Sequence, residues 1–212
     1  DLFQHFGIRK AVLFGHSDGG AMAVLGAATH PNTVQAVYTC AATIAMESET
    51  ARGMADARDA FENQGLRERL LRHHGDNTDS MFWSWYGAWA SADTPLWLTP
   101  AQVGAVKCPV TALFGRDDEY GWRASAHALL DQGTMTLELI ALPGVGHHPQ
   151  QLARGVVLES LRGLIGRLPA RIALRAPVLA LCMTLALVPL SALLLVVAGV
   201  DSMRFTTFFL FK

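Results

Sequence analysis

The sequence predicts an α/β fold with a mostly parallel sheet, and three observations support this. Short apolar segments without helical period, typical of buried strands, occur at 10–14, 34–40, 108–114 and 136–142. Helical segments separate most of them, as expected for parallel strands. The 212 residues also suffice for one sizeable domain. With 17 Lys and Arg against 18 Asp and Glu, no nucleic-acid partner is expected.

The first predicted strand leads through a glycine turn into a helix. Residues 10–14 read KAVLF, the turn reads GHSDGG at 15–20, and small apolar residues follow until Pro31 ends the helix. The second strand, at 34–40, comes after a short connection. We assign residues 1–44 to the core sheet.

Residues 45–106 have a different pattern, because charges recur at helical spacing and strand patterns disappear. This segment is predicted to be an inserted helical cap. Its last helix places Met81, Phe82, Trp85 and Trp89 on one face. These aromatics either form the packing face of the cap or cover a pocket for an apolar or aromatic ligand. Phe82, Trp85 and Trp89, together with His16, are therefore candidate substrate-binding residues.

The sheet pattern resumes over residues 107–168. The strand at 108–114 ends at GRDDEYG (115–121), a helix follows at 123–130, and the strand at 136–142 ends at PGVGHHP (143–149). A final amphipathic helix is predicted over 150–168. Its inward positions are Leu152, Val156, Leu161, Leu164 and Leu168.

Ser17 lies in a G-x-S-x-G motif between a predicted strand and a predicted helix. A sharp turn there would expose the serine hydroxyl at the top of the sheet, and Gly15 and Gly19 would leave room for it. The helix that follows directs backbone N–H groups at the same point. The N–H of Asp18 is thus a candidate donor to an oxyanion.

A serine hydroxyl needs a base that removes its proton, and that base needs an acid to orient it. Asp118 and His147 follow two successive strands, so a parallel sheet would bring both to the edge where Ser17 lies. Taken singly, Asp118 could be a turn former and His147 a surface loop residue. Asp117, Glu119 and His148 are neighbours that could take these roles instead. No metal is predicted from the His and Cys spacing, and this chemistry needs no cofactor.

The segments GHSDGG, GRDDEYG and GVGHHP resemble the nucleophile elbow, acid loop and histidine loop of the α/β-hydrolase superfamily. The resemblance spans about residues 1–168. The segment at 57–89 is similar to the cap of a bacterial subgroup that carries H-S-D-G-G and D-D-E-Y-G and usually acts on small esters or related acyl compounds. The resemblance implies a serine hydrolase with Ser17 as nucleophile, Asp118 as acid and His147 as base. Esterase, lactonase, thioesterase and carbon–carbon hydrolase activities all stay open.

The same resemblance implies that the chain is truncated at its N-terminal side. The superfamily sheet has eight strands, and those predicted here correspond to the fifth through the eighth. Residues 10–14 would then form an open sheet edge, which favours aggregation. The alternative function is therefore an inactive remnant or a binding module.

Residues 169–212 form a hydrophobic tail. Positions 177–200 are 24 consecutive uncharged residues, enough for a helix across a bilayer core of about 30 Å. Arginines at 162, 167, 171 and 175 precede them, so a membrane anchor would keep the enzyme domain in the cytoplasm. Alternatively, the tail is translated out of its proper context or packs over the exposed sheet edge. The sequence leaves the oligomeric state open.

Overall fold

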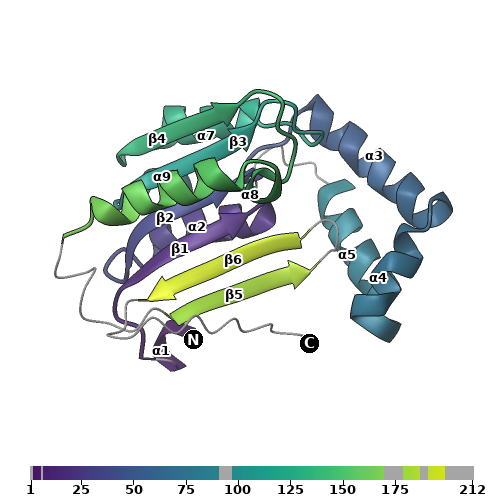
Figure 1. Cartoon of the computed structure of the whole chain (residues 1–212), viewed down its shortest axis with the longest axis horizontal. Coiled ribbons are helices and arrows are strands. Elements are labelled where there is room, and N and C mark those ends of the chain that lie inside the picture. Colours follow the sequence, from purple (N-terminus) through teal and green to yellow (C-terminus); the bar gives the residue numbers. More distant parts are fainter. Residues whose placement is uncertain (1, 6, 91–96, 170–178, 187–190, 199–212) are drawn as a thin grey trace.

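A mixed sheet forms the centre of the fold (Figure 1). The computed structural model describes residues 2–5, 7–90, 97–169, 179–186 and 191–198. Within that part of the chain the strand order is β4-β3-β2-β1-β6-β5. The first four strands run parallel, which is the arrangement predicted from the sequence. The strands are β1 (Ala11–His16), β2 (Val34–Cys40), β3 (Val110–Gly115), β4 (Leu137–Leu142), β5 (Leu179–Ala186) and β6 (Ser191–Ala198).

Helices cover both faces of the parallel strands, so alternate side chains of each strand enter different clusters. In β1, Ala11 and Leu13 face one cluster, whereas Val12 and Phe14 face the other. The helices of this part are α1 (Leu2–His5), α2 (Asp18–Thr29), α6 (Pro100–Gly104), α7 (Arg123–Gln132), α8 (Pro149–Leu152) and α9 (Arg154–Gly166).

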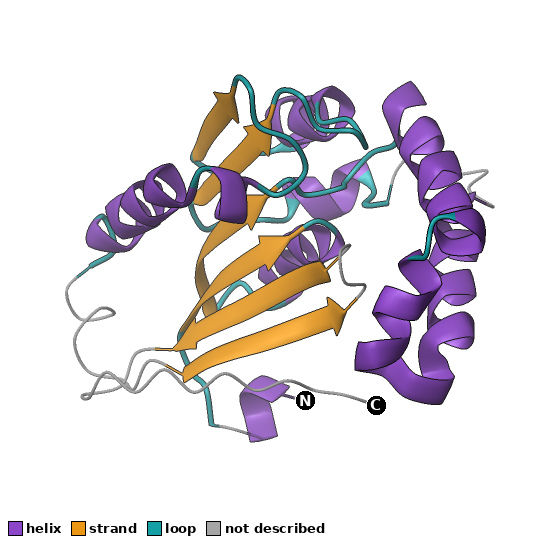
Figure 2. Cartoon of the chain, turned by 45° about the vertical axis from the view of Figure 1, so that its right-hand side comes forward, coloured by secondary structure: helices purple, strands orange, loops and turns teal. Residues whose placement is uncertain are grey.

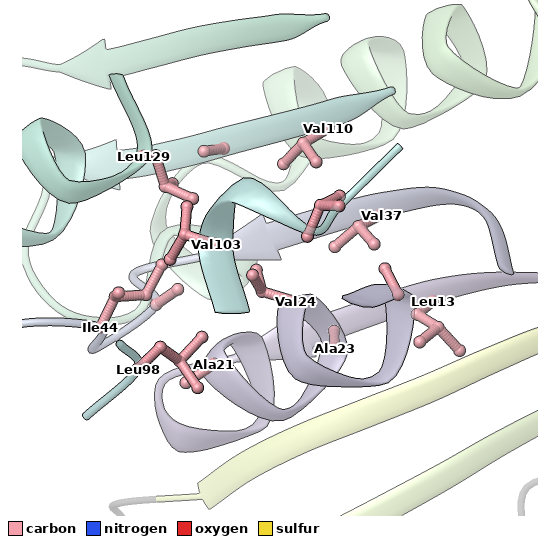
Figure 3. Packing of buried hydrophobic residues seen from close by; sticks show 14 of the residues in the cluster. Leu13, Ala21, Ala23, Val24, Val37, Ile44, Leu98, Val103, Val110 and Leu129 are labelled. Atoms are coloured by element: carbon pink, nitrogen blue, oxygen red, sulfur yellow. The ribbon is translucent and has the colours of Figure 1, made fainter. Parts of the chain in front are cut away.

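The larger cluster lies between the sheet and α2, α6 and α7 (Figure 3). Val24 of α2 is completely buried against Val37 of β2, and Val103 of α6 packs beside Leu129 of α7. Each fully buried aliphatic side chain of this kind contributes about 1.5–3 kcal/mol to folding. This cluster fixes the start of α2, and thereby the turn that precedes it.

The helix predicted over 150–168 is interrupted at Ala153, which has φ −130° and ψ 39°. The interruption separates α8 from α9 and changes the helical phase. As a result, Val157 and Leu164 are buried, whereas Leu152 and Val156 are 65% and 40% exposed. The prediction that the last two face inward is wrong for this reason.

Three helices form the cap at one end of the sheet (Figures 1 and 2). They are α3 (Ser48–Asn63), α4 (Leu66–His74) and α5 (Thr78–Ala90), with a short 3₁₀ turn η1 (Gly75–Asn77) before α5. They share a small core in which the rings of Phe61 and Phe82 stack at 3.8 Å between centroids. The end of the predicted cap segment behaves differently, because Leu98 and Val103 pack in the main cluster instead.

The hydrophobic tail forms strands where the sequence predicts a transmembrane helix. Residues 179–186 and 191–198 are the hairpin strands β5 and β6, and the rest of 177–200 lies outside the described residues. Among the helices that the structure describes, none has the length and apolar character needed to span a bilayer. The prediction of a helix at 177–200 is therefore corrected.

Strand β6 pairs antiparallel with β1, from Val12 opposite Val197 to Gly15 opposite Leu194. The edge of β1 that the sequence predicts to be open is thus occupied. An uncovered strand edge presents unpaired N–H and C=O groups, and a strand satisfies them where a helix would not. The alternative that the tail packs over the sheet edge is confirmed.

Candidate active site

Ser17 occupies a tight turn between β1 and α2. Its φ is 55° and its ψ is −125°, in a region that residues with a Cβ rarely adopt, at a cost of about 1–3 kcal/mol. Backbone hydrogen bonds hold this conformation: the Ser17 N–H donates to the carbonyl of Cys40 at 3.0 Å, and its own carbonyl accepts the N–H of Gly20 at 2.9 Å. The position of the serine is therefore fixed by hydrogen bonds to β2 and to the first turn of α2.

Two glycines allow the close packing that this turn requires. A Cβ on Gly15 would collide with the backbone of Gly19, and a Cβ on Gly20 would meet the side chain of Ala42. The first close approach is the one predicted for the motif. The second, at Gly20, was not anticipated, because it depends on the loop after β2.

Ser17, His147 and Asp118 form one chain of hydrogen bonds. His147 Nε2 lies 3.0 Å from Ser17 Oγ, and His147 Nδ1 lies 2.9 and 3.0 Å from the two carboxylate oxygens of Asp118. A carboxylate only accepts, so Nδ1–H donates to Asp118 and leaves Nε2 to accept from the serine hydroxyl. His147 and Asp118 are 3% and 6% exposed, which limits competition from water.

The loops after β3 and β4 hold these two side chains through backbone contacts. The Tyr120 N–H donates to Asp118 Oδ1 at 2.9 Å, and the His147 N–H donates to the Glu119 carboxylate at 3.2 Å. Asp117 is exposed, and its N–H bonds to the carbonyl of Val145 at 3.0 Å. Neither Asp117 nor Glu119 therefore replaces Asp118 as the partner of the imidazole.

The remaining neighbour, His148, lies beside His147 with 5.4 Å between ring centroids. Burial and the nearby His147 lower the pKa of His148. No hydrogen bond from its ring to Ser17 occurs among the described contacts, so His148 does not take the position of the base.

A pocket opens above the serine between the sheet and the cap. The space free of atoms above the serine is about 310 Å³ and includes open solvent, so the site is a shallow opening and not an enclosed cavity. Trp85 and Trp89 line it, as predicted. The full lining consists of Ser17, Asp18, Thr43, Thr50, Met54, Trp85, Trp89, Tyr120 and His147.

Four of these residues were not identified from the sequence. Tyr120 belongs to the DDEYG segment, and Thr43 follows β2 at the same sheet edge as Ser17, so strand order could have identified both. Thr50 and Met54 lie on α3. Their place in the pocket depends on how the cap sits on the sheet, for which the sequence has no local signal.

His16 and Phe82 do not line the pocket, which corrects their prediction as substrate contacts. Both side chains are completely buried. Successive side chains of β1 point to opposite faces of the sheet, and the side chain of His16 points into the protein interior. There its Nε2 lies 2.7 Å from the backbone carbonyl of His147. Phe82 faces the small core of the cap. The packing interpretation of the aromatic face is therefore correct for Phe82, whereas Trp85 and Trp89 reach the pocket.

Asp18 contributes to the site in two ways. It is the first residue of α2, where backbone N–H groups lack partners within the helix. Its side chain faces the pocket, and Trp89 Nε1–H donates to its Oδ2 at 3.4 Å. Burial raises the pKa of Asp18, and the hydrogen bond from Trp89 opposes that rise only in part.

The histidines and carboxylates at this site are not arranged as metal ligands. Within the described residues, no group of three or more His, Cys, Asp or Glu side chains is arranged to hold a metal ion. Cys40 is buried, and burial raises its pKa.

Known proteins resemble this chain in sequence and in fold. The family described as alpha/beta hydrolase fold matches residues 1–137. Lipase LipV of Mycobacterium tuberculosis is 28% identical over 145 residues, which cover 68% of this chain and 49% of that protein. The chain thus spans about half the length of this curated relative.

Solved structures share the fold at low sequence identity. NosK from Streptomyces actuosus superimposes with a TM-score of 0.58 at 19% identity, covering 77% of this chain and 71% of NosK. The enol-lactonase from Burkholderia xenovorans LB400 has a TM-score of 0.56 at 16% identity, and the match covers 78% of this chain and 69% of the lactonase. A third structure is that of 2-hydroxy-6-oxo-6-phenylhexa-2,4-dienoate hydrolase from Rhodococcus sp. strain RHA1. Its TM-score is 0.53 at 21% identity, and the match covers 76% of this chain and 67% of that hydrolase.

The family match covers more than half of the chain, and the strand, turn and helix around Ser17 have the geometry described above. The chain belongs to the α/β-hydrolase fold family.

Proposed function

We propose that this protein is a serine hydrolase that cleaves small ester or related acyl substrates. The observation on which this rests is the hydrogen-bonded chain from Ser17 Oγ through His147 to Asp118, at the floor of a pocket. A hydroxyl, a base and an orienting acid in this order are the groups that acyl transfer requires. An ester-type substrate is further supported by the similarity of this chain to a lipase, LipV, and to an enol-lactonase.

In the proposed reaction Ser17 Oγ attacks the acyl carbon while His147 Nε2 takes its proton. The Asp118 carboxylate holds Nδ1–H and stabilises the imidazolium that forms. The Asp18 N–H donates to the developing oxyanion at the start of α2. His147 then protonates the leaving group, and water releases the acyl group from Ser17 by the reverse sequence of proton transfers. These steps require no cofactor.

Residues 1–44 and 107–168 supply the nucleophile, the acid and the base, and the cap within 45–106 shapes the pocket above them. The lining from α3 and α5 restricts the space near the serine, which favours short acyl groups. Esterase, lactonase, thioesterase and carbon–carbon hydrolase reactions share these first steps. The roles of Ser17, His147 and Asp118 are therefore the same for all four reactions, and the bond that is cleaved differs among them.

Hydrolysis of p-nitrophenyl butanoate tests the proposal. Replacing Ser17 by Ala is expected to reduce kcat by at least about 10³-fold, because the nucleophile is lost. Ser84→Ala removes an exposed serine of α5 and is the matched control, with activity expected to be unchanged. Folded protein without turnover would instead support the alternative, an inactive remnant or binding module.

A further inference from the structure

Asp18 has the single carboxylate among the described residues that line the pocket, and neither Lys nor Arg lines it. The proposed reaction uses the backbone N–H of Asp18 and leaves its side chain without a role. A negatively charged side chain that lines the pocket beside the nucleophile acts on every substrate that enters. It disfavours an anionic group and favours a cationic one.

The Asp18 carboxylate has spare capacity for a hydrogen-bond donor. An ionised carboxylate offers about four acceptor positions. Trp89 Nε1–H donates to it at 3.4 Å, which is long for an N–H donor. A hydrogen bond from Trp85 and the charge of His147 also lower its pKa, but burial outweighs all three. No ion pair of Asp18 occurs among the described salt bridges. Its raised pKa is consistent with a buried charge that lacks full compensation.

Aromatic rings surround the same space. Trp85, Trp89 and Tyr120 line the pocket with Asp18. Trp89 stacks on Trp97 at 4.7 Å between centroids, and Tyr120 lies 4.7 Å from the His147 ring, so both are held by neighbours. The face of an indole or phenol attracts a cation, most strongly for Trp and where water is excluded. Carboxylate and rings therefore favour the same kind of ligand.

We infer that the pocket selects esters that contain an ammonium group close to the scissile acyl carbon, with Asp18 as the residue that determines this preference. The inference rests on the proposed hydrolase function and narrows its substrate class. Because Asp18 directly follows Ser17 in the chain, the ammonium group would lie a few atoms from the acyl carbon.

Two pairs of substrates with matched shape test this preference. On the acyl side, p-nitrophenyl 3-aminopropanoate is compared with p-nitrophenyl butanoate, in which a methyl group replaces the ammonium. On the alcohol side, acetylcholine is compared with 3,3-dimethylbutyl acetate. Each kcat/KM is divided by the rate of spontaneous alkaline hydrolysis of the same ester, which removes differences in intrinsic reactivity.

For at least one pair, the protein is expected to favour the cationic ester by about tenfold. The primary ammonium can donate a charge-assisted hydrogen bond to Asp18, whereas the quaternary ammonium of acetylcholine is attracted by charge and by the aromatic rings alone. In Asp18→Asn this ratio should fall to within about twofold of unity, because the amide keeps the shape and loses the charge. Asp56→Asn is the matched control and should keep the preference. It removes an exposed carboxylate of α3 whose charge also reaches Tyr120.

A second measurement separates this inference from the hydrolase proposal. Acetylcholine is titrated calorimetrically into Ser17→Ala protein and into the Ser17→Ala, Asp18→Asn double variant, so that binding is measured without turnover. Tighter binding to the first protein, by about tenfold through the attraction of the two charges, supports the inference even if no ester is hydrolysed.

A cationic preference that is absent in both pairs, or that persists in Asp18→Asn, overturns the inference, while turnover of the neutral esters would leave the hydrolase proposal intact. If Asp18→Asn does not fold, Trp85→Leu takes its place. That variant removes one ring from the pocket and should also weaken binding of acetylcholine relative to 3,3-dimethylbutyl acetate.

Discussion

The position of the His147 imidazole depends on residues beneath it as well as on Asp118. His16, directly before Ser17, is completely buried, and its Nε2 lies 2.7 Å from the His147 carbonyl. A carbonyl only accepts, so this ring nitrogen is the donor. One buried side chain thus links the serine turn to the loop of the base.

Replacing His16 by Leu is expected to lower kcat by about 10- to 100-fold, because a small displacement of a catalytic group has a large effect on rate. KM should change little, since His16 does not line the pocket. His16→Gln keeps an N–H donor and should recover part of the loss. Equal kcat values for the Leu and Gln variants would show that the contact with the His147 carbonyl does not position the base.

Asp18 should reduce stability at neutral pH. Its pKa in the folded protein is raised above the usual value of 3.8, chiefly by burial, so the folded state binds the proton more tightly than the unfolded state does. Its contribution to stability is therefore most favourable below pH 3.8 and declines as the pH rises through the raised pKa.

Asp18→Asn should accordingly raise Tm at pH 7 and lose this advantage toward pH 4. Thermal unfolding followed by circular dichroism at several pH values measures both effects. Asp56→Asn, at an exposed site, is the control. An unchanged or lower Tm for Asp18→Asn at pH 7 would contradict the assignment of a buried, poorly compensated carboxylate.

Among the elements, the parallel strands and the helix after Ser17 were predictable, because each has a local pattern. The apolar run at 10–14 and the glycine turn after it correspond to β1 and the start of α2. The interruption at Ala153 was not predictable, since an alanine favours a continuous helix and only packing against the sheet decides the phase of α9. Similarly, Phe82 and Trp85 share one helical face, and only the position of the cap separates core from pocket.

Strand β6 should be essential for the stability of the sheet, because it lies between β1 and β5. Leu195 is paired with Phe14 in the middle of the β1–β6 ladder. Leu195→Pro removes a backbone donor and is expected to lower Tm and to increase light scattering by exposing the edge of β1.

Leu195→Val keeps the backbone N–H and a residue that favours strands, and it serves as the matched control. It should behave like the unmodified chain. If the proline variant melts and scatters light as the valine variant does, residues 191–198 do not pair with β1 in solution.

At the scale of the whole molecule, the sequence alone was informative about the site and misleading about the tail. Ser17, Asp118 and His147 follow three separate strands, and parallel order is sufficient to predict that they share one edge. The tail has the composition of a membrane helix, but composition does not record that β1 has a free edge nearby. That competition between helix and strand is decided by tertiary pairing.

A fluorophosphonate probe, followed by mass spectrometry of the labelled peptides, shows whether Ser17 is a nucleophile activated by His147. One covalent adduct is expected, on Ser17; it should be lost in Ser17→Ala and form much more slowly in His147→Ala, while Ser84→Ala should label normally. Folded protein that acquires no adduct on Ser17, or that labels equally fast without His147, would contradict this role of the two residues.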